Sequence, residues 1–313
     1  MKTFFRSGMI ALLIILLTPP VMAVEKNGFN LDGSLVPVDA IEHGGPARDG
    51  IPSIDKPQFI KARQADFLND DDRILAIDYQ GVQRAYPIRI LNWHEIVNDR
   101  IKGQSVVVSY CPLCGTGLVY SGRIQGKDYQ FGVSGLLYNS DVLMYDRQSE
   151  SLWSQILAKA VTGSLKGTKL TTLPVEHTTW GKWRKAHPNT QVLSTETGYQ
   201  RDYTESPYAG YEQSESVYFR FSAESRRYHP KERVLGVEVN GQFKAYPFVE
   251  LARTGQQQLQ DNFAGQTLQL SFDATTRTGK VQDAQGQPVH TINSFWFAWY
   301  AFHPDTAIFE VKP

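Results

Sequence analysis

An internal duplication is the feature that most constrains how this sequence folds. Residues 73–91 match residues 233–251 without a gap. In each copy, alternating apolar residues lead into a Gln80-Gly81 or Asn240-Gly241 turn, and a second run leaves the turn toward Ala-Tyr-Pro. This pattern is typical of a β-hairpin. A short helical stretch and a further strand are expected to follow each hairpin.

A second element repeats downstream. The motif Trp-x2-Trp-x3-His-Pro begins at Trp180 and again at Trp296, and in both places it predicts a helix followed by a strand. Between the repeated elements the first copy holds residues 111–179, whereas the second holds only residues 273–295. We therefore predict a β-rich α+β fold of two structurally related repeat units, the first with a large insertion that carries a cysteine pair.

This organisation predicts four segments along the chain. Residues 1–23 are a signal peptide, 24–57 an extended N-terminal loop segment, 58–215 the first repeat unit and 216–313 the second, diverged unit. Residues kept in both copies are interpreted as parts of the shared architecture. Tyr86 and Tyr246 belong to this class, as do His187 and His303.

The N-terminus has the order of charged, apolar and small-residue regions found in secretory signal peptides, with a cut predicted after Ala23. Its apolar run is shorter than the roughly 20 residues that cross a bilayer, and no comparable run follows. We therefore expect a periplasmic or secreted protein without a stable membrane span after cleavage. The 32 basic and 32 acidic residues balance, which argues against nucleic acid as a partner.

The two cysteines of the chain, Cys111 and Cys114, lie together after the apolar run 106–108. A pair at this spacing can bind a metal ion or form a reversible disulfide. The loop between them is too short for a disulfide to stabilise the fold much. Export makes their redox state variable, because disulfides persist outside the cytosol.

Metal binding is the leading hypothesis for this pair. His94 and Cys111 align with Thr254 and Asp273 of the second copy, so the histidine and the thiols are absent from it together. Two thiolates and an imidazole suit copper or zinc. Met144 or His43 is a candidate for completing the site, because a structural zinc normally takes four protein ligands.

Two alternatives remain open. The pair can act in thiol-disulfide exchange, although glycines and a strand follow it where a thioredoxin-like motif would open a helix. The chain can also be a non-enzymatic binding module with a structural disulfide. Ser134, Asn139 and Asp141 are further site candidates. The expected partner is a small ligand, or a protein that delivers metal or exchanges disulfides; whether the protein is an enzyme stays open.

Several motifs together resemble the domain of unknown function 3179 family, from about residue 40 to the last repeat. They are the stretches 44–52, Arg84-Ala85-Tyr86-Pro87, 94–99, 110–115, 131–135 and Asn139-Ser140-Asp141. The resemblance implies that His94, Cys111 and Cys114 form a shared signature of the family. It implies no particular activity or substrate.

Overall fold

The computed structural model describes residues 24–311 and is dominated by antiparallel sheets, with 41% of the residues in strands and 11% in helices. Within the described residues, five sheets contain three to five strands each, and two further ribbons contain two strands each. The five sheets are arranged like the blades of a five-bladed propeller.

The expected α+β fold of two repeat units is therefore wrong. The α-helices are only six or seven residues long, too short to form a layer of their own. Residues 111–179, expected as an insertion into one unit, instead supply strands to three different sheets. The helices are α1 (Ile88–His94), α2 (Trp180–Ala186), α3 (Phe248–Arg253) and α4 (Trp296–Phe302), and the 3-10 helices are η1 (Val38–Ala40) and η2 (Ala62–Gln64).

The duplicated hairpins form two sheets that share the order of four strands, and β4 adds a fifth strand to the first sheet. In both, the last strand of the repeated element pairs in parallel with the second strand of the hairpin. Positive φ angles at Gln80-Gly81 and at Asn240-Gly241 give the tight turns that the sequence predicted. The first sheet has the order β17 (Glu176–Thr179), β5 (Arg73–Tyr79), β6 (Val82–Pro87), β18 (Gln191–Leu193) and β4 (Phe59–Lys61). The second has the order β24 (Thr291–Phe295), β19 (Arg233–Val239), β20 (Gln242–Pro247) and β25 (Ala307–Ile308).

The tyrosines kept in both copies hold each hairpin sheet to its neighbour. Tyr86 Oη donates to Asp99 Oδ2 at 2.6 Å, and Tyr246 Oη donates to Asp261 Oδ2 at 2.8 Å. Both tyrosines are fully buried. This equivalence supports their interpretation as structural residues.

The repeated Trp and His-Pro motif is likewise structural. Trp183 Nε1 donates to Thr190 Oγ1 at 2.9 Å, and the His187 ring packs 3.8 Å from the Trp183 ring, centroid to centroid. The second copy repeats both contacts with Trp299, Thr306 and His303.

The remaining strands form three sheets and two ribbons. One sheet contains β16 (Thr172–Leu173), β9 (Thr116–Ser121), β8 (Gln104–Cys111) and β7 (Ile96–Ile101). Another contains β15 (Lys159–Ala160), β14 (Leu152–Ser154), β13 (Asp141–Asp146), β12 (Phe131–Tyr138) and β3 (Ile41–His43). The third contains β21 (Gln258–Phe263), β22 (Gln266–Asp273) and β23 (Thr278–Asp283). The ribbons are β1 (Glu25–Lys26) with β2 (Phe29–Asn30), and β10 (Arg123–Ile124) with β11 (Lys127–Asp128).

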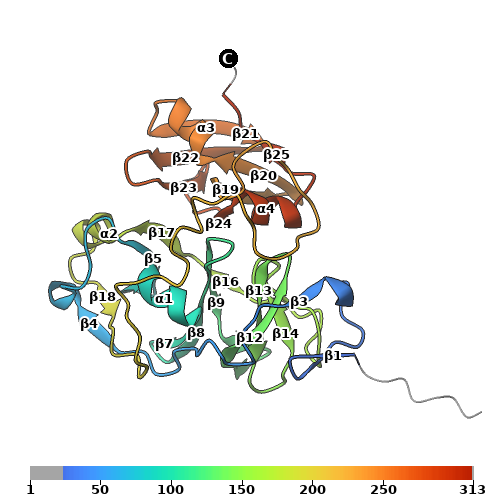
Figure 1. Cartoon of the computed structure of the whole chain (residues 1–313). Helices are drawn as coiled ribbons and strands as arrows, with labels where there is room; N and C mark the ends of the chain where they lie inside the picture. Colours follow the sequence, from blue (N-terminus) through green and yellow to red (C-terminus); the bar gives the residue numbers. More distant parts are fainter. Residues whose placement is uncertain (1–23, 312–313) are drawn as a thin grey trace, which may run out of the picture.

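The largest of the hydrophobic clusters joins three sheets and contains both cysteines. It includes side chains of the β8–β9 hairpin, the β12–β13 hairpin and helix α4. Figure 1 shows these elements meeting where the orange and red C-terminal part of the chain lies against the rest. The cysteines are therefore part of the core that holds the sheets together.

Between residues 24 and 311, no helix has the length and apolar character needed to cross a membrane. The predicted signal peptide, residues 1–23, lies outside the described residues.

Candidate thiol and carboxylate site

The β8–β9 hairpin presents both cysteines at its tip. Cys111 is the last residue of β8, and Cys114 lies in the turn that leads to β9. Gly115 completes the turn with φ +61°, and a Cβ on it would lie 2.8 Å from the Phe295 ring. Only glycine fits this position without strain. The backbone N–H of Phe295 donates to the Cys114 carbonyl at 2.7 Å, so strand β24 fixes the turn.

The two thiols are free and lie about 3.5 Å apart, so the pair is not a disulfide. Cys111 is 1% exposed and Cys114 is fully buried. Burial raises the pKa of the Cys111 thiol, and burial together with the neighbouring Cys111 raises that of Cys114 further. Without a cation both sulfurs are therefore neutral thiols at physiological pH.

A second hairpin brings a carboxylate to the thiols. Strands β12 and β13 are joined by Asn139-Ser140, whose φ angles of 54° and 61° make a two-residue turn of type I′. This turn aims the Ser140 carbonyl at the sulfurs, which donate to it over 3.8 Å from Cys111 and 3.3 Å from Cys114. Asn139 Nδ2 donates to the Ala301 carbonyl of α4 at 3.2 Å and holds the turn in place.

Asp141 is the first residue after that turn and completes a three-residue group. A carboxylate oxygen of Asp141 and the sulfurs of Cys111 and Cys114 all lie within 4.8 Å of one another. Asp141 Oδ2 accepts from the Ile156 backbone N–H at 3.1 Å, whereas Oδ1 is buried and has no hydrogen-bond partner among residues 24–311. Burial raises the pKa of this carboxyl from 3.8 to about 7.

A second buried carboxyl, Glu95, lies next to the group. It follows helix α1 with φ +56°, a strained conformation for a residue other than glycine. Burial raises the pKa of Glu95 from 4.5 to about 8, and the negative charge of Asp141 adds to this. Tyr208 Oη donates to Glu95 Oε1 at 3.4 Å. The site therefore collects two thiols and two carboxyls in a largely apolar environment.

Two tyrosines from the segment between β18 and β19, Tyr208 and Tyr211, pack in or against the hydrophobic cluster that contains both cysteines. The thiols contribute to the raised pKa values of both Tyr208 and Tyr211. Tyr211 is 2% exposed, and its hydroxyl is buried without a partner within the described chain. Sequence reasoning missed Glu95 and both tyrosines as site residues. For Glu95, the only signal in the sequence was its position next to His94. The two tyrosines lie in a segment without regular secondary structure, and nothing in the sequence pointed to them.

His94 lies outside the thiol group. Its Nδ1 is 2.7 Å from the Pro52 carbonyl and its Nε2 is 2.7 Å from Tyr203 Oη. Because a carbonyl only accepts, Nδ1 carries the proton and Nε2 accepts from Tyr203. Both ring nitrogens are thus engaged, and Tyr203 Oη in turn bonds to Thr197 Oγ1 at 2.6 Å.

The other sequence candidates have different surroundings. Met144 is fully buried in the same hydrophobic cluster as the cysteines. His43 is exposed on β3 and accepts from the Gly45 backbone N–H at 3.0 Å. Ser134 Oγ accepts from the Leu136 N–H at 3.0 Å and donates to the Leu143 carbonyl, which stabilises a bulge in β12. Of the three polar candidates beyond the cysteines, only Asp141 contributes a side chain to the group.

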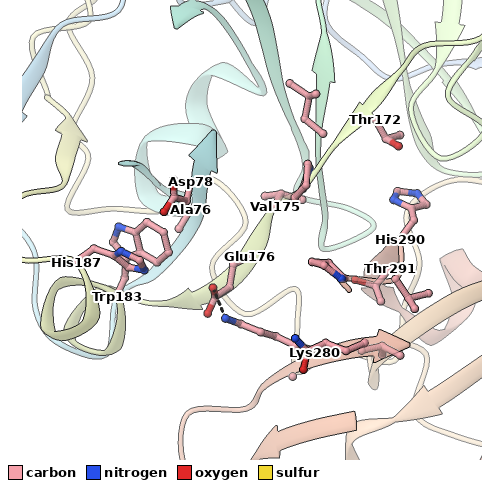
Figure 2. A pocket seen from close by; sticks show the side chains of 17 residues that line it. Ala76, Asp78, Thr172, Val175, Glu176, Trp183, His187, Lys280, His290 and Thr291 are labelled. Atoms are coloured by element: carbon pink, nitrogen blue, oxygen red, sulfur yellow. Dashed lines mark ion pairs between the residues drawn. The ribbon is translucent and has the colours of Figure 1, made fainter. Parts of the chain in front are cut away.

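A separate groove of about 430 Å³ lies between the β5 and β23 sheets and contains none of these residues. Figure 2 shows it bordered by Trp183 and His187 on one side and His290 on the other. An ion pair of 2.7 Å between Glu176 and Lys280 spans the two sheets.

The model of the family described as "Protein of unknown function (DUF3179)" matches residues 48–285, which is most of the chain. The chain belongs to the DUF3179 family. No curated protein and no solved structure matches it. The cysteines, Asp141 and Glu95 all lie inside the DUF3179 region, whose description assigns no activity. The chemistry of the site is therefore the basis for a function.

Proposed function

We propose that the protein binds one zinc ion through Cys111 Sγ, Cys114 Sγ and a carboxylate oxygen of Asp141. The observation that carries this proposal is the convergence of these three atoms within 4.8 Å in a buried position. The unpartnered Asp141 Oδ1 supports it, because an orphaned buried acceptor costs stability unless something binds it.

The ligand chemistry favours zinc over copper. Thiolates bind both Zn²⁺ and Cu⁺, whereas a carboxylate is a hard ligand that suits Zn²⁺ much better than Cu⁺. Two thiolates and one carboxylate carry three negative charges against the two positive charges of Zn²⁺, so the occupied site would keep a net charge of −1. Binding would release the two thiol protons, so the affinity should rise with pH.

Three protein ligands leave a fourth zinc position for water or a substrate group. A zinc ion held this way would supply a Lewis acid. The protein's own contribution is a buried surrounding: Tyr208 and Tyr211 pack with the hydrophobic cluster that contains the cysteines, and the Tyr211 hydroxyl has no partner among the described residues.

Metal analysis of reduced, mature protein tests this proposal. We expect one zinc per chain, with affinity measured by competition against a chromophoric chelator. Asp141→Asn should weaken binding by about 100-fold or more, since even the loss of a residue that only orients a metal ligand costs roughly 10–100-fold. His94→Gln is the matched control and should retain one zinc, because His94 binds Pro52 and Tyr203 instead. Equal zinc content in wild type and a Cys111→Ser, Cys114→Ser double variant would refute the site.

The thiol separation of about 3.5 Å also supports a second candidate, thiol-disulfide exchange. In this reaction the two thiols lose two electrons and two protons to a partner disulfide, which is reduced to two thiols. Burial of both sulfurs argues against easy attack. Titration against glutathione redox buffers tests it, and a pair that stays reduced under oxidising, metal-free conditions would exclude it.

We further propose that the chain is exported, with cleavage after Ala23. The order of regions at the N-terminus supports this. N-terminal sequencing of protein from an extracytoplasmic fraction should begin at Val24. A partner that delivers metal would have to reach two buried thiols.

A further inference from the structure

We propose that a cavity next to the thiol site binds a short-chain monocarboxylate, held by Arg73 and Arg233. This binding site stands independently of zinc. The cavity has a volume of about 140 Å³ and is lined from the first and second copies together.

The duplication itself places the two arginines. Arg73 begins β5 and Arg233 begins β19, which are equivalent positions of the two copies. Both line the cavity. Each copy thus contributes one guanidinium to a shared space, which no single copy could build.

The two guanidinium groups differ in whether an acidic side chain balances their positive charge. Arg233 Nε donates to Glu212 Oε1 at 2.9 Å, and Glu212 also lines the cavity. Arg73 forms no ion pair within residues 24–311; its Nη1 donates to the carbonyls of Thr276 and Arg277 at 2.9 and 3.3 Å. Its Nη2 is buried without a partner in that part of the chain. One positive charge and one donor therefore remain for a ligand.

The charges around the cavity favour an anion. Burial, together with the positive charge of Arg233, lowers the pKa of Arg73 from 12.5 to about 10. His177 also lines the cavity, but its Nε2 donates to the Gly117 carbonyl at 2.9 Å, and burial lowers its pKa to about 3. The histidine is thus neutral. With one excess positive charge, the cavity matches a monoanion rather than a dianion.

The apolar residues that line the cavity determine which kind of group can follow the carboxylate of the ligand. Ile74, Ile88, Pro112 and Phe295 give the cavity an apolar part. At the ~30 Å³ that a water molecule occupies in the liquid, the cavity of about 140 Å³ has the volume of roughly five waters. Butyrate has this size, with a carboxylate for the arginines and a short apolar tail.

The cavity borders the thiol site. Tyr208 and Tyr211 line it and pack with the hydrophobic cluster that contains the thiols, and Pro112 lies between the two cysteines in the chain.

Calorimetric titration with sodium butyrate tests the proposal, on metal-free and on zinc-treated protein. We expect saturable binding of butyrate and none of butyramide, its neutral analogue. Arg73→Gln should weaken binding roughly tenfold or more, because it removes a charged hydrogen bond. Arg100→Gln, which changes an exposed arginine on another sheet, is the matched control.

Glu212→Gln keeps the test decisive even if Arg73→Gln unfolds. Glu212 is 49% exposed and should tolerate the change. Removing its negative charge should strengthen butyrate binding several-fold. Absence of saturable binding, equal binding of butyramide, or unchanged affinity in Glu212→Gln would each overturn the proposal. Binding to metal-free protein is independent of the zinc result, so the two proposals fail separately.

Discussion

Replacing Glu95 with glutamine tests whether the carboxyl beside the thiols is kept protonated by its surroundings. Glu95 is 7% exposed, and burial raises its pKa from 4.5 to about 8. Between these values the folded chain keeps a proton that the unfolded chain releases. The unfolding free energy of the metal-free protein must therefore fall as the pH rises through this window.

The pKa values of Glu95 in the unfolded and the folded chain set the size of this change in unfolding free energy. One pKa unit is worth about 1.4 kcal/mol, so Glu95 alone lowers the unfolding free energy by roughly 3 kcal/mol between pH 5 and pH 8. Glutamine has nearly the same shape and does not titrate. Glu95→Gln should therefore match wild type within about 1 kcal/mol at pH 5 and exceed it by roughly 3 kcal/mol at pH 8.

Urea unfolding of reduced, chelator-treated protein at several pH values from 5 to 8 measures this difference. Asp141, whose pKa is raised to about 7, also makes the unfolding free energy fall as the pH rises. Because wild type and Glu95→Gln both contain Asp141, this contribution is the same in both proteins. Glu150→Gln, at a carboxyl whose side chain is 59% exposed, is the control and should follow wild type. If Glu95→Gln and wild type lose stability in parallel, Glu95 is ionised in the folded protein and the reasoning is wrong.

Three further outcomes are expected. Zinc at 100 times its dissociation constant should raise the unfolding free energy by about 2.7 kcal/mol, and a Cys114→Ser variant should show no such rise in urea unfolding. Gly115→Ala should destabilise the fold by roughly 1–3 kcal/mol, because the new Cβ meets the Phe295 ring at positive φ; an unchanged urea midpoint would contradict this. His177 has its pKa lowered by burial from 6.5 to about 3, so the unfolded chain takes up the proton first and stability should fall as the pH drops from about 6 to 4. His177→Gln should reduce that acid slope by up to about 1.4 kcal/mol per pH unit, and equal slopes would argue against a buried neutral histidine.

Local pairing was predictable from the sequence, whereas the packing of the sheets was not. The hairpins around Gln80-Gly81 and Asn240-Gly241 follow from short-range turn chemistry, and they have the expected form. Nothing in either hairpin specifies which other sheet covers it. The same β-rich pattern fits two α+β units and the sheet arrangement found, so the error arose at the level of long-range packing.

The candidate site was partly predictable for the same reason. The cysteine pair is local in sequence, but its third member, Asp141, is brought in by a separate hairpin. His94 precedes the strand leading to the cysteines, yet α1 directs its ring toward Pro52 and Tyr203. Proximity along the chain favoured the histidine. The fold instead places the next residue, Glu95, near the thiols and Asp141.

The hydrogen bond from Phe295 to the Cys114 carbonyl makes the cysteine-free copy a structural component of the thiol site. Asn139, which precedes Ser140 and Asp141, is held in the same way by Ala301. A fragment ending before residue 233 would keep all three thiol and carboxylate side chains but lose the contacts that orient them. The second copy could then not be shortened or exchanged without disturbing the chemistry of the first, so duplication has here produced a supporting part of the site instead of a spare domain.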